Sequence, residues 1–417
     1  MKIISQNKKN FPYHHFFSLA LCLIGVWIIY SFPNAISSDQ GCITVDFSSY
    51  PNFSDGIITF LTFGVYNFIF HPPLEVFNTH IRIFSLILYV GSAYLLATRL
   101  LKDKRWVIIF MAILFSSRFP FLWLSRELIV GAYLSLAVAA FVRNWNPFFI
   151  CFLIFLMGNT KPEVFLVSLA FMCVLIKRSF GSSRNEEKRA DSRSDAAKKA
   201  WPNRFKPAFM LIGVYLFANF FIALPEILST KTIDTSRRPF FTFGQHYSDM
   251  VDIHQISPTG NGFGKSYIYL DTVFPGAKNM QDVVLHYPKK YYDFLWLSLG
   301  HGVKRAVVLF HVFLIFIFII YRSIKNGKFE NNLFYNLFFL SLLGTIPFFL
   351  FSYPHIRYLA RYYPLAILCI LYFLERCNDS KVLKSSYYVL SIGLMINIIL
   401  FFKSLSMLHS GNYWFPD

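Results

Sequence analysis

The sequence predicts an all-α polytopic integral membrane protein with about eleven transmembrane helices. Of its 417 residues, 55% are hydrophobic, 19% are aromatic and only 15% are charged, and the mean hydropathy is +0.46. Soluble domains carry about 25% charged residues, so this composition is typical of a chain that lies in a bilayer. Long apolar runs recur along the chain, and basic residues gather between alternate runs.

The apolar runs divide the chain into spans and connections. A helix needs about 20 residues to cross the hydrocarbon core, and shorter runs fit inside a bundle. The runs cover residues 16–32, 81–98, 106–124, 128–142, 148–158, 164–176, 208–224, 303–321, 333–351, 359–374 and 387–402.

The charge pattern predicts how the spans are oriented. A formal net charge of +18 in a soluble protein would indicate a nucleic-acid partner. Here the basic clusters all fall on one side of the predicted spans, as cytoplasmic loops do, so no nucleic acid is expected. We therefore predict a protein of the bacterial inner (plasma) membrane, with a cytoplasmic N-terminus and an extracytoplasmic C-terminus. The basic clusters lie at residues 2–9, 99–105, 143, 177–206, 322–328 and 376–384.

Composition also divides the chain into five parts. Residues 1–176 form an N-terminal transmembrane module, and residues 177–207 form a basic cytoplasmic linker. A transmembrane helix at 208–224 leads to residues 225–302, which are too long for a simple connection. We expect this segment to form an extracytoplasmic cap between the seventh and eighth spans. Residues 303–417 form a C-terminal transmembrane module.

Polar residues gather at the predicted outer ends of the spans. Charges at membrane depth are costly, so either ion pairing or function is expected to hold them there. Basic residues on the outer face also run against the usual distribution, and an anionic lipid phosphate would explain their presence. The candidates are Asp39, Asp46, His71, Arg126, Glu127, Lys161, Glu163, His355, Arg357 and Arg361.

Three motifs on this face carry a family resemblance. "HPPL" at residues 71–74 follows the acidic first outer loop, "TKPE" at 160–163 joins two short spans, and "RYYPLAILCILYFL" occupies residues 361–374. Their order resembles the GT-C class of polytopic glycosyltransferases, which contains protein mannosyltransferases and aminoarabinose lipid A transferases. The resemblance implies hexosyl or pentosyl transfer from a polyprenyl-phosphate donor to a lipid, glycan or protein acceptor, in cell-envelope glycan biosynthesis.

The resemblance also implies catalytic residues. In this family the first outer loop carries an acidic residue just after the first helix, often within an Asp-Glu pair. The matching place reads "SSDQG", so Asp39 is the first candidate for the base that takes the acceptor's hydroxyl proton. Gln40 stands where the pair's second acid would be, and Asp46 therefore remains an alternative.

The other candidates fit donor and substrate binding. An arginine fork suits a leaving phosphate, so Arg357 is expected to hold it together with the other basic groups. His71 either binds substrate or a metal, or is a hydrogen-bonded structural residue. No metal-ligand set is predicted, although a divalent cation stays open as a cofactor. The donor-phosphate candidates are Arg357, Lys161, Arg126 and Arg361, and the substrate candidates are His71, Glu163, Glu127 and His355.

Three other readings remain open. A polysaccharide polymerase or ligase of the O-antigen type also has many spans and outer arginines, but "HPPL" and the acidic loop favour the transferase. A transporter of lipid-linked glycans would favour charges at the bilayer midplane and paired broken helices. A non-catalytic assembly subunit would keep the same fold.

Overall fold

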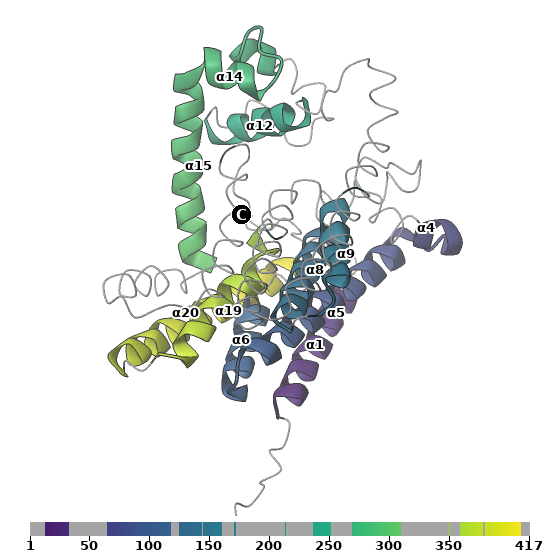
Figure 1. The fold of residues 1–417 in the computed structure, drawn as a ribbon. Helices are drawn as coiled ribbons and strands as arrows, with labels where there is room; N and C mark the ends of the chain where they lie inside the picture. The colour runs from purple at the N-terminus through teal and green to yellow at the C-terminus, as the bar shows by residue number, and fades with distance from the viewer. Residues whose placement is uncertain are drawn as a thin grey trace, which may run out of the picture.

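The computed structural model describes residues 13–32, 65–117, 125–143, 145–160, 237–251, 269–309, 359–377 and 380–409, with single positions at 171, 213 and 350. In this part of the chain the regular structure is helical and no strand is present, as predicted. The helices, shown in Figure 1, are α1 (Tyr13–Ser31), α4 (Val65–Phe70), α5 (Leu74–Leu100), α6 (Lys104–Ser116), α8 (Ser125–Val142), α9 (Pro147–Thr160), α12 (Arg237–Met250), α14 (Met280–His286), α15 (Pro288–Leu309), α19 (Tyr363–Glu375) and α20 (Ser380–His409).

Three of the described helices are long and apolar enough to cross a membrane, in agreement with the predicted membrane class. They comprise Tyr13–Ser31, Glu75–Leu100 and Ser380–Ser406. Shorter apolar helices lie at Glu127–Val142 and Tyr363–Glu375, which pack against the second of these spans, and at Phe149–Gly158, which packs against Glu127–Val142. The total of about eleven spans and the extracytoplasmic position of the cap remain predictions.

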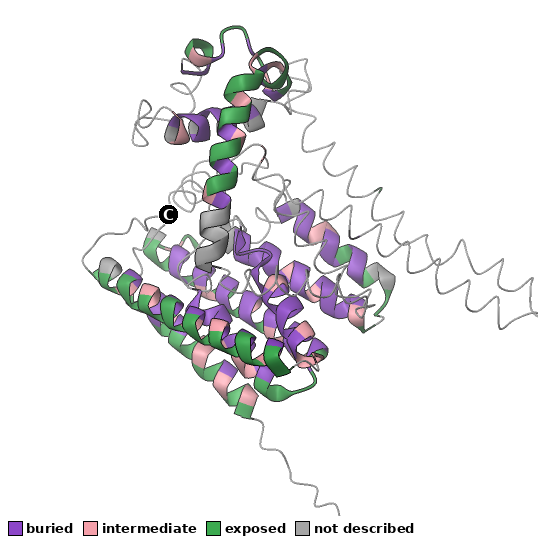
Figure 2. Cartoon of the chain, turned by 90° about the vertical axis from the view of Figure 1, so that its left-hand side faces the viewer, coloured by how far each residue is buried: buried purple, intermediate pink, exposed green. Residues whose placement is uncertain are grey.

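One helical bundle contains both the first and the last helices of the chain. α5 packs against α1, α6 and α8, while α19 packs against α5, α6 and α8. α19 is buried along nearly its whole length, and its apolar residues belong to the same hydrophobic core as those of α5 and α8. Figure 2 shows buried residues through the middle of the bundle and exposed ones along its margin. The predicted N-terminal and C-terminal modules therefore share one core.

The two ends of the bundle are identified by contacts between α1 and α5. His15 near the start of α1 shares a hydrogen bond with Tyr94 in the last part of α5. At the other end of α1, Arg82 in the first part of α5 donates from Nη1 to the carbonyl oxygen of Phe32 over 2.8 Å. The two helices are therefore antiparallel. We call the end that holds the start of α1 the inner end, following the predicted orientation, and the opposite end the outer end.

A second, smaller core joins α12, α14 and the first part of α15, which we call the cap unit. The ring of Phe243 lies 4.7 Å from that of Phe294 and 5.7 Å from that of Phe274, centroid to centroid. Gly244 lets α12 approach closely, because a Cβ there would lie 2.5 Å from Leu270 Cδ2. The Asn279 side chain caps α14 by accepting a hydrogen bond from the Asp282 N–H. Figures 1 and 2 both place this unit beyond the outer end of the bundle.

Candidate functional site

Most of the predicted site residues lie outside the described part of the chain. Of Asp39, Asp46, Lys161, Glu163, His355 and Arg357 the structure therefore says nothing. Arg126 lies in the first turn of α8, but its side chain is not described. Three candidates are described in full: His71, Glu127 and Arg361.

Glu127 and Arg361 come together at the outer end of the bundle. Glu127 lies in the first turn of α8, where a carboxylate interacts favourably with the helix dipole. Arg361 lies in the turn before α19, and Pro364 follows at the first positions of that helix, where a missing N–H has no cost. Each predicted polar turn therefore ends at the start of a helix.

A buried ion pair links these two turns. Arg361 Nη2 lies 3.0 Å from Glu127 Oε1, and the two side chains are 0% and 1% exposed. Because solvent is excluded, the attraction between the charges is much stronger than on a surface, and so is the cost of leaving either charge alone. The pair joins residues that are 234 positions apart in the sequence.

Close packing surrounds the ion pair. Tyr89 of α5 donates its hydroxyl hydrogen to the carbonyl oxygen of Ala360 over 2.7 Å, next to Arg361. Gly131, one turn after Glu127, allows this approach. A Cβ at that position would lie 2.8 Å from Tyr89 Cε2 and 3.1 Å from the Arg361 carbonyl oxygen. Three helices, α5, α8 and α19, thus meet at one outer junction.

Arg82 forms a second polar contact towards the outer end. Its side chain is buried, and the hydrogen bond to Phe32 meets a carbonyl group at the end of α1 that lacks an intrahelical donor. A cation is also favourable at the negative end of a helix dipole. Phe32 begins the connection that carries Asp39, so Arg82 fixes where the predicted acidic loop leaves the bundle.

His71 lies in the turn between α4 and α5. Its φ is 41°, in the left-handed region that non-glycine residues seldom adopt. Pro72 disfavours the right-handed helical conformation for the residue before it, and Pro73 serves as the N-cap residue of α5. The prolines therefore separate two helices, α4 and α5. Tyr66 of α4 closes the turn through a hydrogen bond of 2.6 Å with His80 Nδ1.

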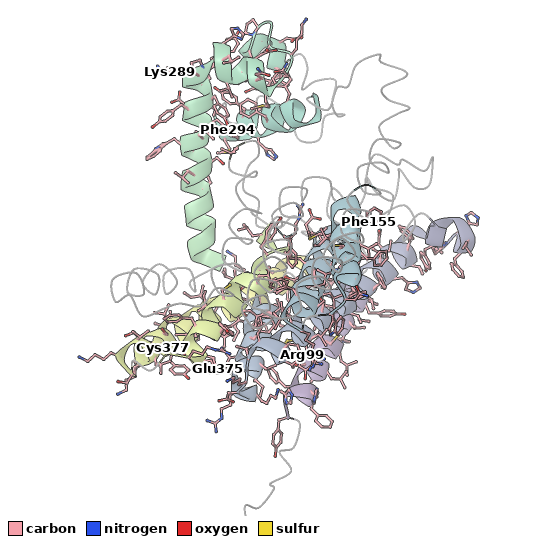
Figure 3. All side chains as sticks on the ribbon, viewed as in Figure 1. Arg99, Phe155, Lys289, Phe294, Glu375 and Cys377 are labelled. Carbon is pink, nitrogen blue, oxygen red and sulfur yellow. The ribbon has the colours of Figure 1, made fainter. Side chains whose placement is uncertain are left out.

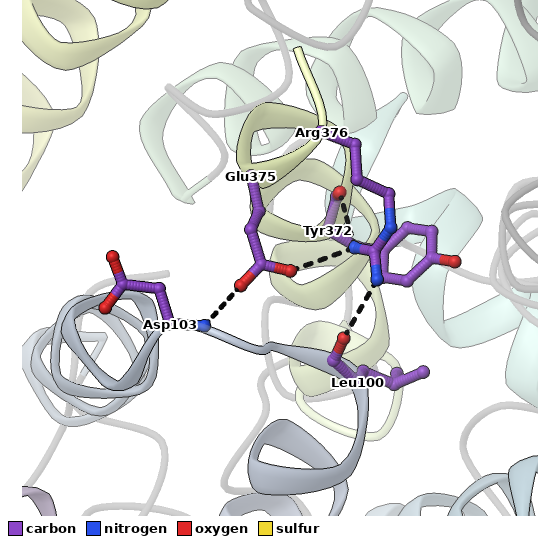
Figure 4. Close-up of polar contacts among 5 residues, drawn as sticks. All are labelled: Leu100, Asp103, Tyr372, Glu375 and Arg376. Carbon is purple, nitrogen blue, oxygen red and sulfur yellow. Dashed lines mark hydrogen bonds and ion pairs between the residues drawn. The ribbon is translucent and has the colours of Figure 1, made fainter. Parts of the chain in front are cut away.

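The inner end has a polar cluster of its own, drawn in Figure 4. Glu375 Oε1 accepts a hydrogen bond from the Asp103 N–H over 2.7 Å, and its other oxygen lies 3.0 Å from Arg376 Nη1. Arg376 also donates to the carbonyl oxygens of Tyr372 and Leu100, and its guanidinium lies 3.5 Å from the centre of the Tyr372 ring. The cluster joins the end of α19 to the turn between α5 and α6.

Sequence reasoning missed several residues of the outer junction. Arg82 had a usable signal, since a charge within an apolar run is unusual. Tyr89 and Gly131 had none, because a tyrosine and a glycine are ordinary members of a membrane helix. Within the described residues, no group of three or more His, Cys, Asp and Glu side chains is placed to hold a metal ion.

Comparison with known proteins does not assign the chain to a family. No protein-family model matches the chain, and neither a curated protein nor a solved structure matches it.

Proposed function

We propose that the protein is a membrane glycosyltransferase of GT-C type. It moves a sugar from a polyprenyl-phosphate donor to a lipid, glycan or protein acceptor at the outer end of the bundle. The observation that carries the proposal is the convergence of α8 and α19. α19 begins within one of the three motifs on which the family resemblance rests, α8 begins at another of the predicted polar outer turns, and the two turns are distant in the sequence.

The buried ion pair refines the roles of the predicted residues. The side chain of Arg361 is fully buried and is bonded to Glu127, which fits a positioning role better than direct contact with a mobile phosphate. Arg357 lies four residues earlier, and we assign it to the leaving phosphate with Lys161 or Arg126. The ion pair then holds the segment that carries Arg357 close to the start of α8, where Arg126 lies.

The acidic first loop supplies the base in this proposal. Asp39 takes the hydroxyl proton of the acceptor as the hydroxyl oxygen attacks the anomeric carbon and the lipid phosphate leaves. The hydrogen bond from Arg82 to Phe32 supports this role, because it anchors the chain seven positions before Asp39.

The test is transfer activity with purified protein and a panel of polyprenyl-phosphate sugars. Asp39→Asn keeps the size of the side chain but removes the base, and we expect transfer to fall by about a hundredfold or more. Asp46→Asn is the matched control in the same loop. If both single variants and the double variant keep full activity, the acid–base proposal is wrong.

A cellular measurement separates this function from the polymerase reading. Mass spectrometry of envelope glycans from a deletion strain should show the loss of one sugar substituent. A change in glycan chain length alone would contradict the transferase and favour a polymerase.

A further inference from the structure

α15 has two unlike faces. One face carries Tyr291, Phe294 and Ser298 at helical spacing; Phe294 belongs to the core of the cap unit, Tyr291 packs against it, and Ser298 is buried. Figure 3 shows Phe294 on the side of α15 that faces α12. The opposite face is exposed and carries a row of residues that are three or four positions apart. From the start of the helix towards the bundle they are Lys289, Tyr292, Trp296 and Leu299, and Asp293 and Gly300 are exposed on the same face.

The order of these exposed residues follows a polarity gradient. The charged side chains of Lys289 and Asp293 lie in the first turns, Tyr292 lies between them, and a tryptophan and then an aliphatic side chain follow. This is the sequence of environments that a helix meets as it enters a bilayer, because cations favour the lipid phosphates and Tyr and Trp favour the layer beneath them. Tyr292 and Trp296 are separated by about 6 Å along the helix axis, comparable to one interfacial layer of the bilayer.

Two further observations place this row at the membrane boundary. Tyr291 donates its hydroxyl hydrogen to the carbonyl oxygen of Leu350 over 3.2 Å, and Leu350 lies at the end of the predicted span 333–351. α15 also continues to Leu309 without interruption, into the predicted span 303–321. The first turn of α15 therefore lies beside the end of the predicted span 333–351. The later residues of α15 then lead into the other predicted span, 303–321.

A comparison with α1 supports the same placement. α1 is a candidate span, and near its outer end Trp27 and Tyr30 are 67% and 73% exposed. Trp296 and Tyr292 of α15 are exposed to a similar extent, 66% and 63%. Aromatic residues of this kind form the belts that mark bilayer interfaces.

We propose that the exposed face of α15 is a lipid-binding surface that seats the cap unit on the membrane. Lys289 contacts lipid phosphate, Tyr292 and Trp296 lie in the interfacial layer, and Leu299 lies in the hydrocarbon. The cap is thus held at a fixed height above the bundle by a helix that belongs to both. This surface does not depend on the reaction that the protein catalyses.

The test uses the full-length protein in lipid nanodiscs, with its six native cysteines replaced by alanine. A single cysteine at Trp296→Cys or Leu299→Cys carries an environment-sensitive fluorophore. Leu285→Cys on α14 is the control, because Leu285 is also 64% exposed but lies in the helix before α15, away from the bundle. We expect brominated lipid to quench the label at 296 and 299 but not at 285, and aqueous iodide to do the reverse.

Three results would overturn the proposal. Iodide quenching at 296 as strong as at 285 would place this face in water. Protection from both quenchers, together with cysteine cross-links between two copies, would show that a second copy covers the face. Equal quenching of the labels at 285 and 299 by each reagent would show that α15 does not pass from water into lipid. Each labelled variant is first checked to be monodisperse in detergent, and Tyr292→Cys replaces any variant that is not.

Discussion

Two acid–arginine pairs of the same length lie at opposite ends of the bundle. Glu127 and Arg361 at the outer end are 3.0 Å apart with side chains at most 1% exposed. Glu375 and Arg376 at the inner end are also 3.0 Å apart, with side chains 8% and 28% exposed. The distance is equal, so the energetic difference comes from what surrounds each pair.

The surroundings give the two pairs different tasks. The outer pair joins two helices that are remote in the sequence, and each charge faces the other where solvent does not reach. The inner pair joins neighbouring residues, and both side chains also bind backbone groups of adjoining helices. The comparison teaches that the outer pair links two remote helices where solvent is excluded, whereas the inner pair is reinforced by hydrogen bonds with nearby backbone groups.

The largest effect is expected when one member of the outer pair is removed. Glu127→Ala or Arg361→Ala leaves an uncompensated buried charge, which costs about 3–5 kcal/mol. Denaturant unfolding of purified protein in detergent measures this loss. A cost below about 1 kcal/mol, the range of exposed pairs, would contradict the buried pairing.

The double variant Glu127→Leu/Arg361→Met sharpens the same comparison. Replacing a buried ion pair by apolar groups of similar size is often nearly neutral, so most of the lost stability should return. A double-mutant cycle built on Ala variants then measures the coupling between the two sites, which should exceed about 1 kcal/mol. Strict additivity of the two single effects would mean that the side chains do not interact.

Arg82 offers an intermediate case. Its side chain is buried, as those of Glu127 and Arg361 are. Its hydrogen bond to Phe32, however, is accepted by a backbone carbonyl, as are two of the hydrogen bonds of Arg376. Arg82→Met should cost about 1.5–3 kcal/mol, the range for hydrogen bonds to charged groups. Arg82→Lys keeps the charge and should recover part of this loss in the same unfolding assay. Equal losses for the two variants would argue against a charge-assisted bond.

The smallest effect is expected at the inner pair. Glu375→Gln keeps an oxygen that can accept the Asp103 N–H, so it should cost no more than about 1 kcal/mol. Partial solvent exposure also makes this cost fall as salt is added, whereas the cost of Glu127→Ala should change little. Unfolding curves at low and high ionic strength provide the measurement. A salt-dependent effect at Glu127 and a salt-independent one at Glu375 would reverse the assignment.

Sequence patterns predicted the helical class well because hydropathy alone decides it. The run 16–32 overlaps nearly all of α1, and the run 81–98 lies within α5. The helix ends were less well predicted. α15 crosses the expected boundary at residue 302 although Gly300 and Gly302 lie there, because its only proline, Pro288, stands at its first position and no later residue removes a backbone donor.

The partners of the polar residues could not be predicted from the sequence. Both Glu127 and Arg361 stood out as costly charges, but their pairing depends on the packing of α8 against α19. That packing depends in turn on Gly131, whose missing side chain leaves room for Tyr89 and for the backbone at Arg361. Such a steric fit has no signature in composition or periodicity, which report only which face of a helix is apolar.

The sequence separation of the outer pair has a consequence for biogenesis. Glu127 and Arg361 are 234 positions apart, so at about 5–20 residues per second α8 is synthesised roughly 10–50 s before its partner exists. During that interval the outer junction cannot close around Glu127, and the first helices wait in the membrane as an open assembly. A ribosome that stalls between the two residues would leave a nascent chain in which the carboxylate of Glu127 lacks its arginine.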